Sequence, residues 1–391
     1  MAFLIRTMVK IAAAFGVSEI VPQFVDRMWS ASAFGQMDSG LCTIATIFAA
    51  LLSFKYTRIA FLSITMYNKI QIKGVMFVRD GCGRLIRYLR LSVTDLCNFR
   101  CQYCMPPEGV QKRCHGDILS VEECVEVVRA AAACGVNKVR LTGGEPLVRR
   151  GIVDICAGIS EIPEIQELCI TTNGSLLPRL AGDLRRAGVT RLNISLDTLN
   201  KEKFHAITRV GTEHDVLDGI RAAQEAGFTD LKLNTVLLGV WNDDEIPDLV
   251  ALTKDNPWQV RFIELMPMGI CADWPRERFL PASVVPERCP DLQPIGEGAV
   301  TTEYRVPGWV GTVGLITPLS HRFCSRCDRI RITSDGRLKP CLHSDQEIPL
   351  RGLHGQALIE AIEAGIAAKP QHHQLESGRT GTHRDMNQIG G

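Results

Sequence analysis

The sequence has no strong excess of charge of either sign. Its 391 residues include 44 Lys and Arg against 43 Asp and Glu, which gives a formal net charge of +1. Proteins whose main partner is a nucleic acid or an anionic membrane surface usually carry a basic excess. The balance therefore argues against both as partners, and an anionic substrate would have to be bound by a local cluster of Arg and Lys side chains.

The sequence also lacks a hydrophobic run that could cross a bilayer. The stretch at 41–54 (LCTIATIFAALLSF) is apolar for about 14 residues, whereas a membrane helix needs about 20. It lies too far along the chain for a signal peptide and lacks the composition of a transit peptide. We therefore expect residues 1–75 to be an extension of unknown role in a cytoplasmic protein. A targeting role, or a true start at Met66 or Met76, are the alternatives.

Cysteine is unusually frequent, because the chain contains 15. Several lie in apolar segments and are most simply small core residues. Others form two tight clusters, which suits metal binding in a reducing compartment better than a disulfide framework. Each cluster has three cysteines, and neither contains the fourth ligand that closes a structural zinc site.

Short runs rich in Val, Ile and Leu alternate with stretches of helical periodicity from about residue 87 onwards. Strands are predicted at 88–93, 138–142, 167–171, 191–196, 231–236 and 260–265. Helices are predicted at 151–159, 176–187, 215–226 and 243–254, and after the capping box formed by Ser120 and Glu123. Six strand–helix units in a row indicate a parallel sheet with right-handed crossovers.

These six units occupy about 180 residues, whereas a closed eight-unit barrel takes about 250. We therefore predict an α/β fold with a partial (βα)6 TIM-like barrel over residues 76–270. Such a barrel is open along one side, and the C-terminal region at 271–375, which carries its own cysteines, is the expected cover. The last stretch, 376–391, is polar and is expected to be a flexible tail that ends in Gly-Gly.

The first cysteine cluster follows the first predicted strand, at the end of the barrel where parallel barrels carry their chemistry. Cys97, Cys101 and Cys104 have the spacing C-x3-C-x2-C. Three thiolates can hold a cluster of four irons and four sulfides and leave one iron without a protein ligand. That iron could then bind a small molecule. A zinc site completed by a distant ligand is the alternative.

The second cluster consists of Cys324, Cys327 and Cys341, at spacing C-x2-C-x13-C. We expect it to hold a second iron–sulfur cluster with an open iron. A zinc site remains the alternative, because His343 or His321 could supply a fourth ligand.

Two arginines lie between the cysteines of the second cluster. Arg329 and Arg331 are two residues apart, so on an extended strand their side chains share one face. Two guanidinium groups beside a metal cluster form a fork that suits phosphate oxygens. A solvated basic face is the simpler alternative.

The first cysteine motif, with Tyr103 just before its last cysteine, resembles the radical S-adenosylmethionine (SAM) superfamily. The stretch TGGEP at 142–146 strengthens the resemblance, since it matches a segment that meets the methionine amino group of SAM. The resemblance implies that the open iron chelates SAM. It also implies that SAM is cleaved reductively to a 5′-deoxyadenosyl radical, which abstracts hydrogen from a substrate.

The pairing of both cysteine motifs is similar to one family in particular, the molybdenum cofactor biosynthesis protein A family of GTP 3′,8-cyclases. The similarity runs from about Asp80 to Gly391. It implies that the second cluster binds the guanine of GTP and that the radical removes the ribose 3′ hydrogen. C3′ then bonds to C8 to give (8S)-3′,8-cyclo-7,8-dihydroguanosine 5′-triphosphate, in the first step of molybdenum cofactor biosynthesis.

The resemblance also assigns individual residues. It implies SAM contacts at Tyr103, Gly144, Ser195 and Met266. It implies GTP contacts at Arg90, Arg140, Thr171, Lys232, Arg329, Ile330 and Arg331. It implies catalytic roles for Arg329, Arg331 and the terminal glycines Gly390 and Gly391, which would insert toward the active site.

The resemblance further implies an electron donor such as flavodoxin or ferredoxin, delivery of the product to cyclic pyranopterin monophosphate synthase, and a homodimer. Two other functions remain open. One is a different radical SAM enzyme with an auxiliary cluster, such as a peptide maturase, and the other is a non-catalytic zinc or iron–sulfur binding module. His343 departs from the family pattern, in which an apolar or aromatic residue is expected.

Overall fold

The structure is a computed structural model, and it describes residues 69–72, 75–373, 375 and 380–390. The apolar stretch at 41–54, and with it nearly all of the predicted N-terminal extension, lies outside the described residues. Residues Asn68–Gly391 form one compact unit. Among the described helices, none is long and apolar enough to cross a membrane.

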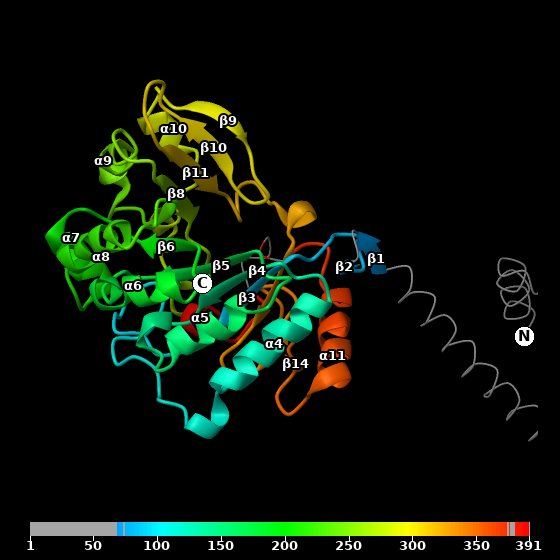
Figure 1. The fold of residues 1–391 in the computed structure, drawn as a ribbon. Helices are drawn as coiled ribbons and strands as arrows, with labels where there is room; N and C mark the ends of the chain where they lie inside the picture. The colour runs from blue at the N-terminus through cyan, green and yellow to red at the C-terminus, as the bar shows by residue number, and fades with distance from the viewer. Residues whose placement is uncertain (1–68, 73–74, 374, 376–379, 391) are drawn as a thin grey trace, which may run out of the picture. The chain divides into compact units, whose positions relative to one another are not determined.

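Six parallel strands form the centre of the fold (Figure 1). They are β3 (Tyr88–Ser92), β4 (Lys138–Thr142), β5 (Glu167–Thr172), β6 (Arg191–Ser195), β7 (Leu231–Leu237) and β8 (Gln259–Glu264). They are hydrogen-bonded in this order, which is also their order along the chain. The predicted α/β fold with a partial (βα)6 TIM-like barrel is confirmed.

Helices connect these strands and cover the outer face of the sheet. They are α4 (Val121–Ala133), α5 (Ile152–Ser160), α6 (Leu177–Arg186), α7 (Lys201–Thr208), α8 (Glu213–Glu225) and α9 (Ile246–Ala251). The predicted capping box begins α4: the Ser120 hydroxyl accepts a hydrogen bond from the Glu123 amide, and the Glu123 carboxylate accepts one from the Ser120 amide. Helix α7 was not predicted. Its N-cap is Asn200, whose side chain accepts a hydrogen bond from the Lys203 amide.

The C-terminal region extends the sheet at both edges. Its elements are α10 (Val284–Arg288), β9 (Gln293–Glu297), β10 (Thr302–Arg305), β11 (Thr312–Ile316), β12 (Arg329–Ile332), β13 (Arg337–Lys339), β14 (Ile348–Pro349), α11 (Gly355–Ala367) and α12 (Met386–Ile389). Strand β11 pairs in parallel with β8 at one edge of the barrel, and β12 pairs in parallel with β3 at the other. The connection at 317–328 therefore runs from one edge to the other, across the open side.

Smaller elements complete the description. Strands β1 (Lys69–Ile72) and β2 (Val75–Val78) form an antiparallel pair. Single turns of 3-10 helix are η1 (His115–Asp117), η2 (Pro146–Val148), η3 (Asp243–Glu245), η4 (Gly269–Cys271), η5 (Arg276–Arg278) and η6 (Cys324–Arg326).

The barrel strands bury one face against the helices and turn the other inward. In β7 the residues Leu231, Leu233 and Leu237 are fully or almost fully buried, in the main hydrophobic core. The alternate positions Lys232 and Asn234 face the interior of the barrel, where they line a cavity. The inner face of the barrel is thus polar and surrounds a space, whereas a closed barrel fills its interior with apolar side chains.

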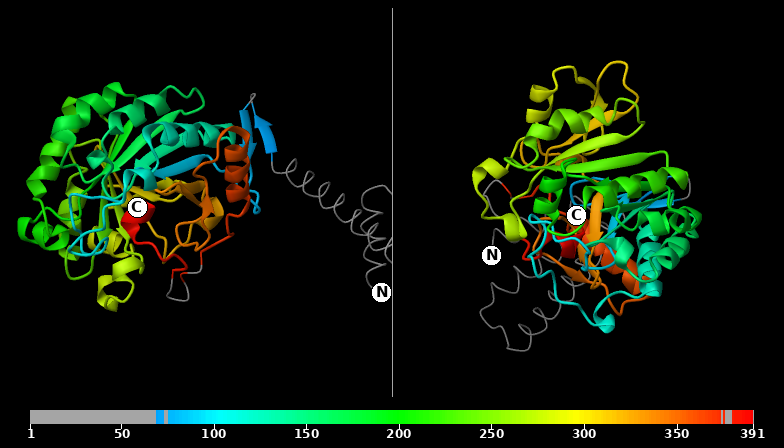
Figure 2. Two further views of the ribbon diagram at one scale, coloured as in Figure 1. Left: turned by 90° about the horizontal axis from the view of Figure 1, so that it is seen from below. Right: turned by 90° about the vertical axis from the view of Figure 1, so that its left-hand side faces the viewer.

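The C-terminal segment differs from the flexible tail expected from its polarity. Residues 380–390 are folded against the barrel (Figure 2). Ile389 has no exposed surface and Asn387 is 1% exposed. Arg384 forms ion pairs with Asp335 and Glu347. The apolar Ile389 and this pair of carboxylates explain why a polar sequence is held in place.

Candidate active site

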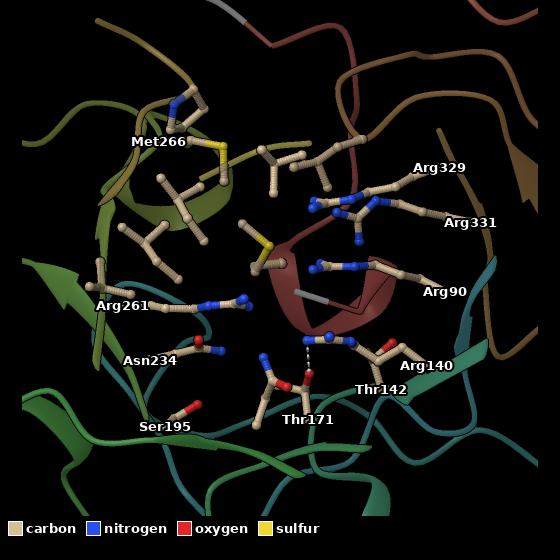
Figure 3. A pocket seen from close by; sticks show the side chains of 18 of the residues that line it. Arg90, Arg140, Thr142, Thr171, Ser195, Asn234, Arg261, Met266, Arg329 and Arg331 are labelled. Atoms are coloured by element: carbon tan, nitrogen blue, oxygen red, sulfur yellow. Dashed lines mark hydrogen bonds between the residues drawn. The ribbon is translucent and has the colours of Figure 1, made fainter. Parts of the chain in front are cut away.

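The register of the strands arranges cationic side chains in a row across the inside of the barrel. Arg331 of β12 lies opposite Arg90 of β3, and Arg90 lies opposite Arg140 of β4. Arg140 lies opposite Cys169 of β5, which in turn lies opposite Arg191 of β6. Three of the predicted GTP contacts therefore lie side by side, namely Arg331, Arg90 and Arg140 (Figure 3). Arg90 and Arg331 are more than 200 residues apart in the sequence.

The four arginines of this row line a cavity of about 560 Å³ inside the barrel. The cavity is also lined by the other residues to which the sequence assigned SAM or GTP contacts, with one exception. They are Tyr103, Gly144, Thr171, Ser195, Lys232, Met266 and Arg329. The exception is Ile330, whose side chain has no exposed surface and packs in the hydrophobic core on the other face of β12. Its backbone lies opposite Leu89 in the sheet.

All six cysteines of the two motifs line the same cavity. Cys97, Cys101 and Cys104 lie in the loop after β3. Cys324 and Cys327 lie in the connection that crosses the open side of the barrel, and Cys341 follows β13. All six are free thiols. The connection across the open side of the barrel thus brings two cysteines of the second motif to the cavity that the first motif lines.

The loop that carries the first motif is packed against the Gly-Gly turn after β4. A Cβ atom on Gly144 would come within 2.5 Å of the Leu96 carbonyl oxygen, and one on Gly143 would overlap the Thr94 carbonyl oxygen. Gly143 also has φ of 150°, which side-chain-bearing residues rarely adopt. The two glycines therefore fix the distance between the β4 turn and the loop that leads into Cys97.

Two buried carboxyl groups stabilise the surroundings of the first motif. Glu145 accepts hydrogen bonds from the Thr172 hydroxyl and the Asn173 amide, and burial raises its pKa to about 7. Asp197 accepts a hydrogen bond of 2.7 Å from the Tyr103 hydroxyl, and burial raises its pKa to about 6. The second contact fixes the aromatic ring at the position just before Cys104.

His343 was considered as a fourth ligand if the second motif binds zinc. Its Nδ1 atom lies 3.3 Å from the Thr380 hydroxyl, and its ring packs edge-on against that of His373. Within the described ranges, no group of three or more His, Cys, Asp and Glu side chains is arranged to hold a single metal ion. Clusters of four irons and four sulfides are held by cysteine thiolates, and both sets of three thiols line the cavity.

The electrostatics of the cavity favour an anionic ligand. Burial, followed by the neighbouring arginines Arg140 and Arg191, lowers the pKa of Arg261 to about 9. Burial and Arg329 lower the pKa of Arg331 to about 10. Guanidinium groups remain charged at neutral pH, so these shifts express a free-energy cost that a polyanion would remove.

Unsatisfied polar atoms point to the same conclusion. Most of the buried side-chain nitrogen and oxygen atoms that have no hydrogen-bond partner within the described structure belong to residues that line the cavity. They are Tyr88 Oη, Arg90 Nε, Arg140 Nε, Arg191 Nε, Asn193 Nδ2 and Oδ1, Asn234 Oδ1 and Arg329 Nε. Buried polar atoms are normally paired, so a concentration of unpaired ones marks a site where a polar ligand binds.

The structure adds four residues that the sequence analysis did not single out. Tyr88 lies with its ring within 6 Å of the charged ends of Arg90, Lys138, Arg140 and Arg329. Arg261, Asn193 and Asn234 line the cavity from β8, β6 and β7. Alternate residues of a strand share a face, so Asn234 shares the face of Lys232 and Asn193 shares the face of Ser195. This pattern could have placed both asparagines on the inner face of the barrel.

The end of the chain reaches the same cluster of charges. Arg331 Nη1 donates a short hydrogen bond to the Gly390 carbonyl oxygen. A Cβ atom on Gly390 would overlap the Thr142 hydroxyl, and its φ is 77°. Gly390 is therefore both conformationally and sterically restricted to glycine. Gly391 lies outside the described residues.

Comparisons with known protein families divide the chain into two matched parts. Residues 91–253 match the radical SAM superfamily, and residues 258–375 match the family described as Molybdenum Cofactor Synthesis C. The structure resembles that of Streptococcus suis SuiB with a TM-score of 0.53 at 14% identity, covering 91% of this chain and 79% of that one. At this identity the likeness supports the fold alone.

Curated relatives give a closer match. The chain is 50% identical over 318 residues to the GTP 3′,8-cyclase of Peptoclostridium acidaminophilum, covering 80% of this chain and 98% of the relative. It is 46% identical over 320 residues to that of Alkaliphilus oremlandii, with 80% and 100% covered. For Geobacter sulfurreducens the identity is 47% over 308 residues, with 76% and 94% covered. The chain therefore belongs to the GTP 3′,8-cyclase family of radical SAM enzymes.

Proposed function

We infer that this protein is a GTP 3′,8-cyclase, which converts GTP to (8S)-3′,8-cyclo-7,8-dihydroguanosine 5′-triphosphate in the first step of molybdenum cofactor biosynthesis. The observation that carries this inference is that two sets of three thiols and a row of arginines line one cavity. Identity of 42–50% to curated cyclases over most of the chain supports the same activity.

The enzyme uses two 4Fe-4S clusters and SAM. We propose that Cys97, Cys101 and Cys104 hold the first cluster. The second cluster would be held by Cys324, Cys327 and Cys341. When bound, the first cluster supplies the electron that cleaves SAM, and the radical so formed removes the 3′ hydrogen of GTP.

The residues around the first cysteine motif suit a zwitterionic cofactor. We propose that Tyr103, Gly144, Ser195 and Met266 contact SAM, since all four line the cavity and lie at or after the carboxyl ends of barrel strands, as the first motif does. Asp197 would act through Tyr103, because its carboxylate accepts the hydrogen bond of the tyrosine hydroxyl.

The cationic part of the cavity suits a triphosphate. We propose that Arg90, Arg140, Thr171, Lys232, Arg329 and Arg331, which line the cavity, contact GTP. Ile330 is proposed with them as the residue between Arg329 and Arg331 on β12, with its side chain in the core. The Thr171 hydroxyl accepts a hydrogen bond of 3.3 Å from Arg140 Nη1 (Figure 3). Arg261 belongs to the same group by its charge and burial. Guanidinium pairs bind phosphate oxygens in a bidentate manner.

The end of the chain is part of the proposed catalytic machinery. Arg331 would divide its donors between the Gly390 carbonyl and the substrate, so the tail would set the orientation of this guanidinium. We propose the same insertion for Gly391. Arg329 would act beside Arg331 on the phosphates.

The proposed function also involves other proteins and a division of the chain into parts. We propose that a flavodoxin or ferredoxin supplies the electron, that cyclic pyranopterin monophosphate synthase takes the product, and that the enzyme is a cytoplasmic homodimer. The division into an extension at 1–75, a barrel at 76–270, a cover at 271–375 and a tail at 376–391 that ends in Gly-Gly is also proposed. Arg384 in the described part of this tail forms ion pairs with Asp335 and Glu347 of the cover.

An anaerobic turnover assay tests the function. With reconstituted protein, SAM and a reductant, we expect 5′-deoxyadenosine and methionine to be released only when GTP is present, and about eight irons per chain, as two four-iron clusters require. SAM cleavage that ignores GTP and responds to a peptide would instead identify a peptide maturase. A protein that binds one or two zinc ions and no iron would be a non-catalytic module.

A further inference from the structure

Asn193 lies at the centre of β6 with its side chain inside the barrel. It is 1% exposed, and it lines the cavity. Neither its Nδ2 nor its Oδ1 atom has a hydrogen-bond partner within the described part of the chain. Because both ends are unpaired, either orientation of the amide leaves one donor group and one acceptor without a partner. A buried amide with both ends unpaired is costly unless a ligand completes it.

The chemistry of the amide narrows the identity of the missing ligand group. Phosphate oxygens only accept hydrogen bonds, so a phosphate would satisfy Nδ2 and leave Oδ1 unpaired. The surrounding guanidinium groups of Arg90, Arg140 and Arg261 already provide donors for phosphates. A hydroxyl group both donates and accepts, and two neighbouring hydroxyls on one sugar would satisfy both ends of the amide.

The position of Asn193 agrees with a sugar. In the register of the sheet it lies between Thr171 of β5 and Lys232 of β7, both proposed to contact GTP. Ser195, proposed to contact SAM, is two residues further along the same strand and on the same face. Asn193 thus lies where the parts of the cavity proposed for the two ligands meet. The ribose carbon that loses its hydrogen has to lie at this junction.

We propose that Asn193 binds the 2′ and 3′ hydroxyl groups of the GTP ribose and thereby orients C3′ toward the SAM side of the cavity. The inference rests on the proposed function, since it names the residue that recognises the sugar of that substrate. It makes Asn193 a substrate-binding residue that selects ribonucleotides over 2′-deoxyribonucleotides.

The test compares nucleotides that differ by one hydroxyl. Dissociation constants of GTP and 2′-deoxy-GTP are measured by equilibrium dialysis on the cluster-loaded protein, and release of 5′-deoxyadenosine is measured with each. For the unmodified protein we expect tighter binding of GTP by about tenfold, the effect of one or two hydrogen bonds. Asn193→Leu, which fills the space without polar atoms, should bind both nucleotides equally. Asn193→Ser, which retains a donor and an acceptor, should keep part of the preference.

Asn242 provides a matched control. It is also 1% exposed, but its side chain is fully paired with Leu238, Asp197 and Val236, and it is not among the residues that line the cavity. Asn242→Ala should lower the melting temperature and leave the ratio of the two dissociation constants unchanged.

Three outcomes separate the possibilities. An unchanged ratio in a folded Asn193→Leu protein would overturn the proposal. Weaker binding of SAM, with the GTP ratio unchanged, would also overturn it, because Asn193 would then read the sugar of SAM. If the unmodified protein released no 5′-deoxyadenosine with GTP, the proposed function itself would fail, and the binding ratio would still decide the role of Asn193.

Discussion

At the scale of single residues, the site is a cluster of buried cationic side chains, of which Arg191 pairs with Glu167 and Asp230. Lys232 lies inside the barrel with its ammonium 3.1 Å from the Gln259 side-chain oxygen. Burial, together with the positive charges of Arg261 and Arg191, lowers the pKa of Lys232 to about 8. A lysine with this pKa is only partly charged in mildly alkaline solution, and a triphosphate beside it would favour the charged form.

This predicts that binding of GTP takes up a proton near pH 8. GTP binding raises the pKa of Lys232. Well below pH 8 the lysine is protonated in both the free and the GTP-bound protein, whereas above pH 8 it loses its proton in the free protein and keeps it in the bound protein. Affinity for GTP should therefore fall as the pH rises through 8. Calorimetry in two buffers of different ionisation enthalpy measures the uptake. Lys232→Met should abolish it, and the same uptake in that variant would assign the proton to another group.

A second prediction concerns Arg261, which the strand pattern of the sequence did not single out. Hydrogen bonds to charged groups contribute about 1.5–3 kcal/mol, so Arg261→Met should weaken binding of GTP by about 10- to 100-fold. Binding of guanosine, which has no phosphate, should change little. Dissociation constants for both ligands measure the difference. Arg305→Met, at an exposed position of β10, is the control and should leave both constants unchanged.

At the scale of elements, the connection at 317–328 decides what the barrel encloses. It joins β11 at one edge to β12 at the other, and it carries Cys324 and Cys327. The same strand order explains why β12 brings Arg329 and Arg331 beside β3. The cover is therefore also a source of ligands. A protein that lost its second cluster would keep the barrel and the first motif.

Replacement of one cysteine of this connection should separate the two clusters. Cys324→Ser should retain about four irons per chain, the content of a single four-iron cluster. It should still bind SAM but lose GTP-dependent release of 5′-deoxyadenosine. Iron analysis and an anaerobic assay measure both. Full activity with four irons would remove the second cluster from the mechanism, and loss of all iron would show that the two sites fold together.

At the scale of the whole molecule, the barrel could be predicted from the sequence, but only some of the side chains in its interior could. The six strands were predicted within one or two residues, because each is a short apolar run between helices, as with 138–142 and β4. Helix α7 was missed because it is short and only weakly amphipathic. The folded state of 380–390 depends on the distant partners of Arg384, which no local pattern reveals.

The cysteine motifs and Arg329 and Arg331 were found because their spacing carries chemical meaning. Asn193 and Arg261 were not singled out, because strand periodicity gives only the face of the sheet on which a residue lies and does not indicate a function. Ile330 was included as part of the contiguous run from Arg329 to Arg331, but alternate residues of a strand face opposite sides. Its side chain packs in the core.

The central claim is that SAM and GTP react within one cavity. The most direct test uses GTP labelled with deuterium at C3′, with SAM and a reductant under anaerobic conditions. Mass spectrometry then follows the deuterium. We predict that it appears in 5′-deoxyadenosine and that unlabelled GTP gives none. Formation of 5′-deoxyadenosine without deuterium, at a rate independent of GTP, would contradict the account.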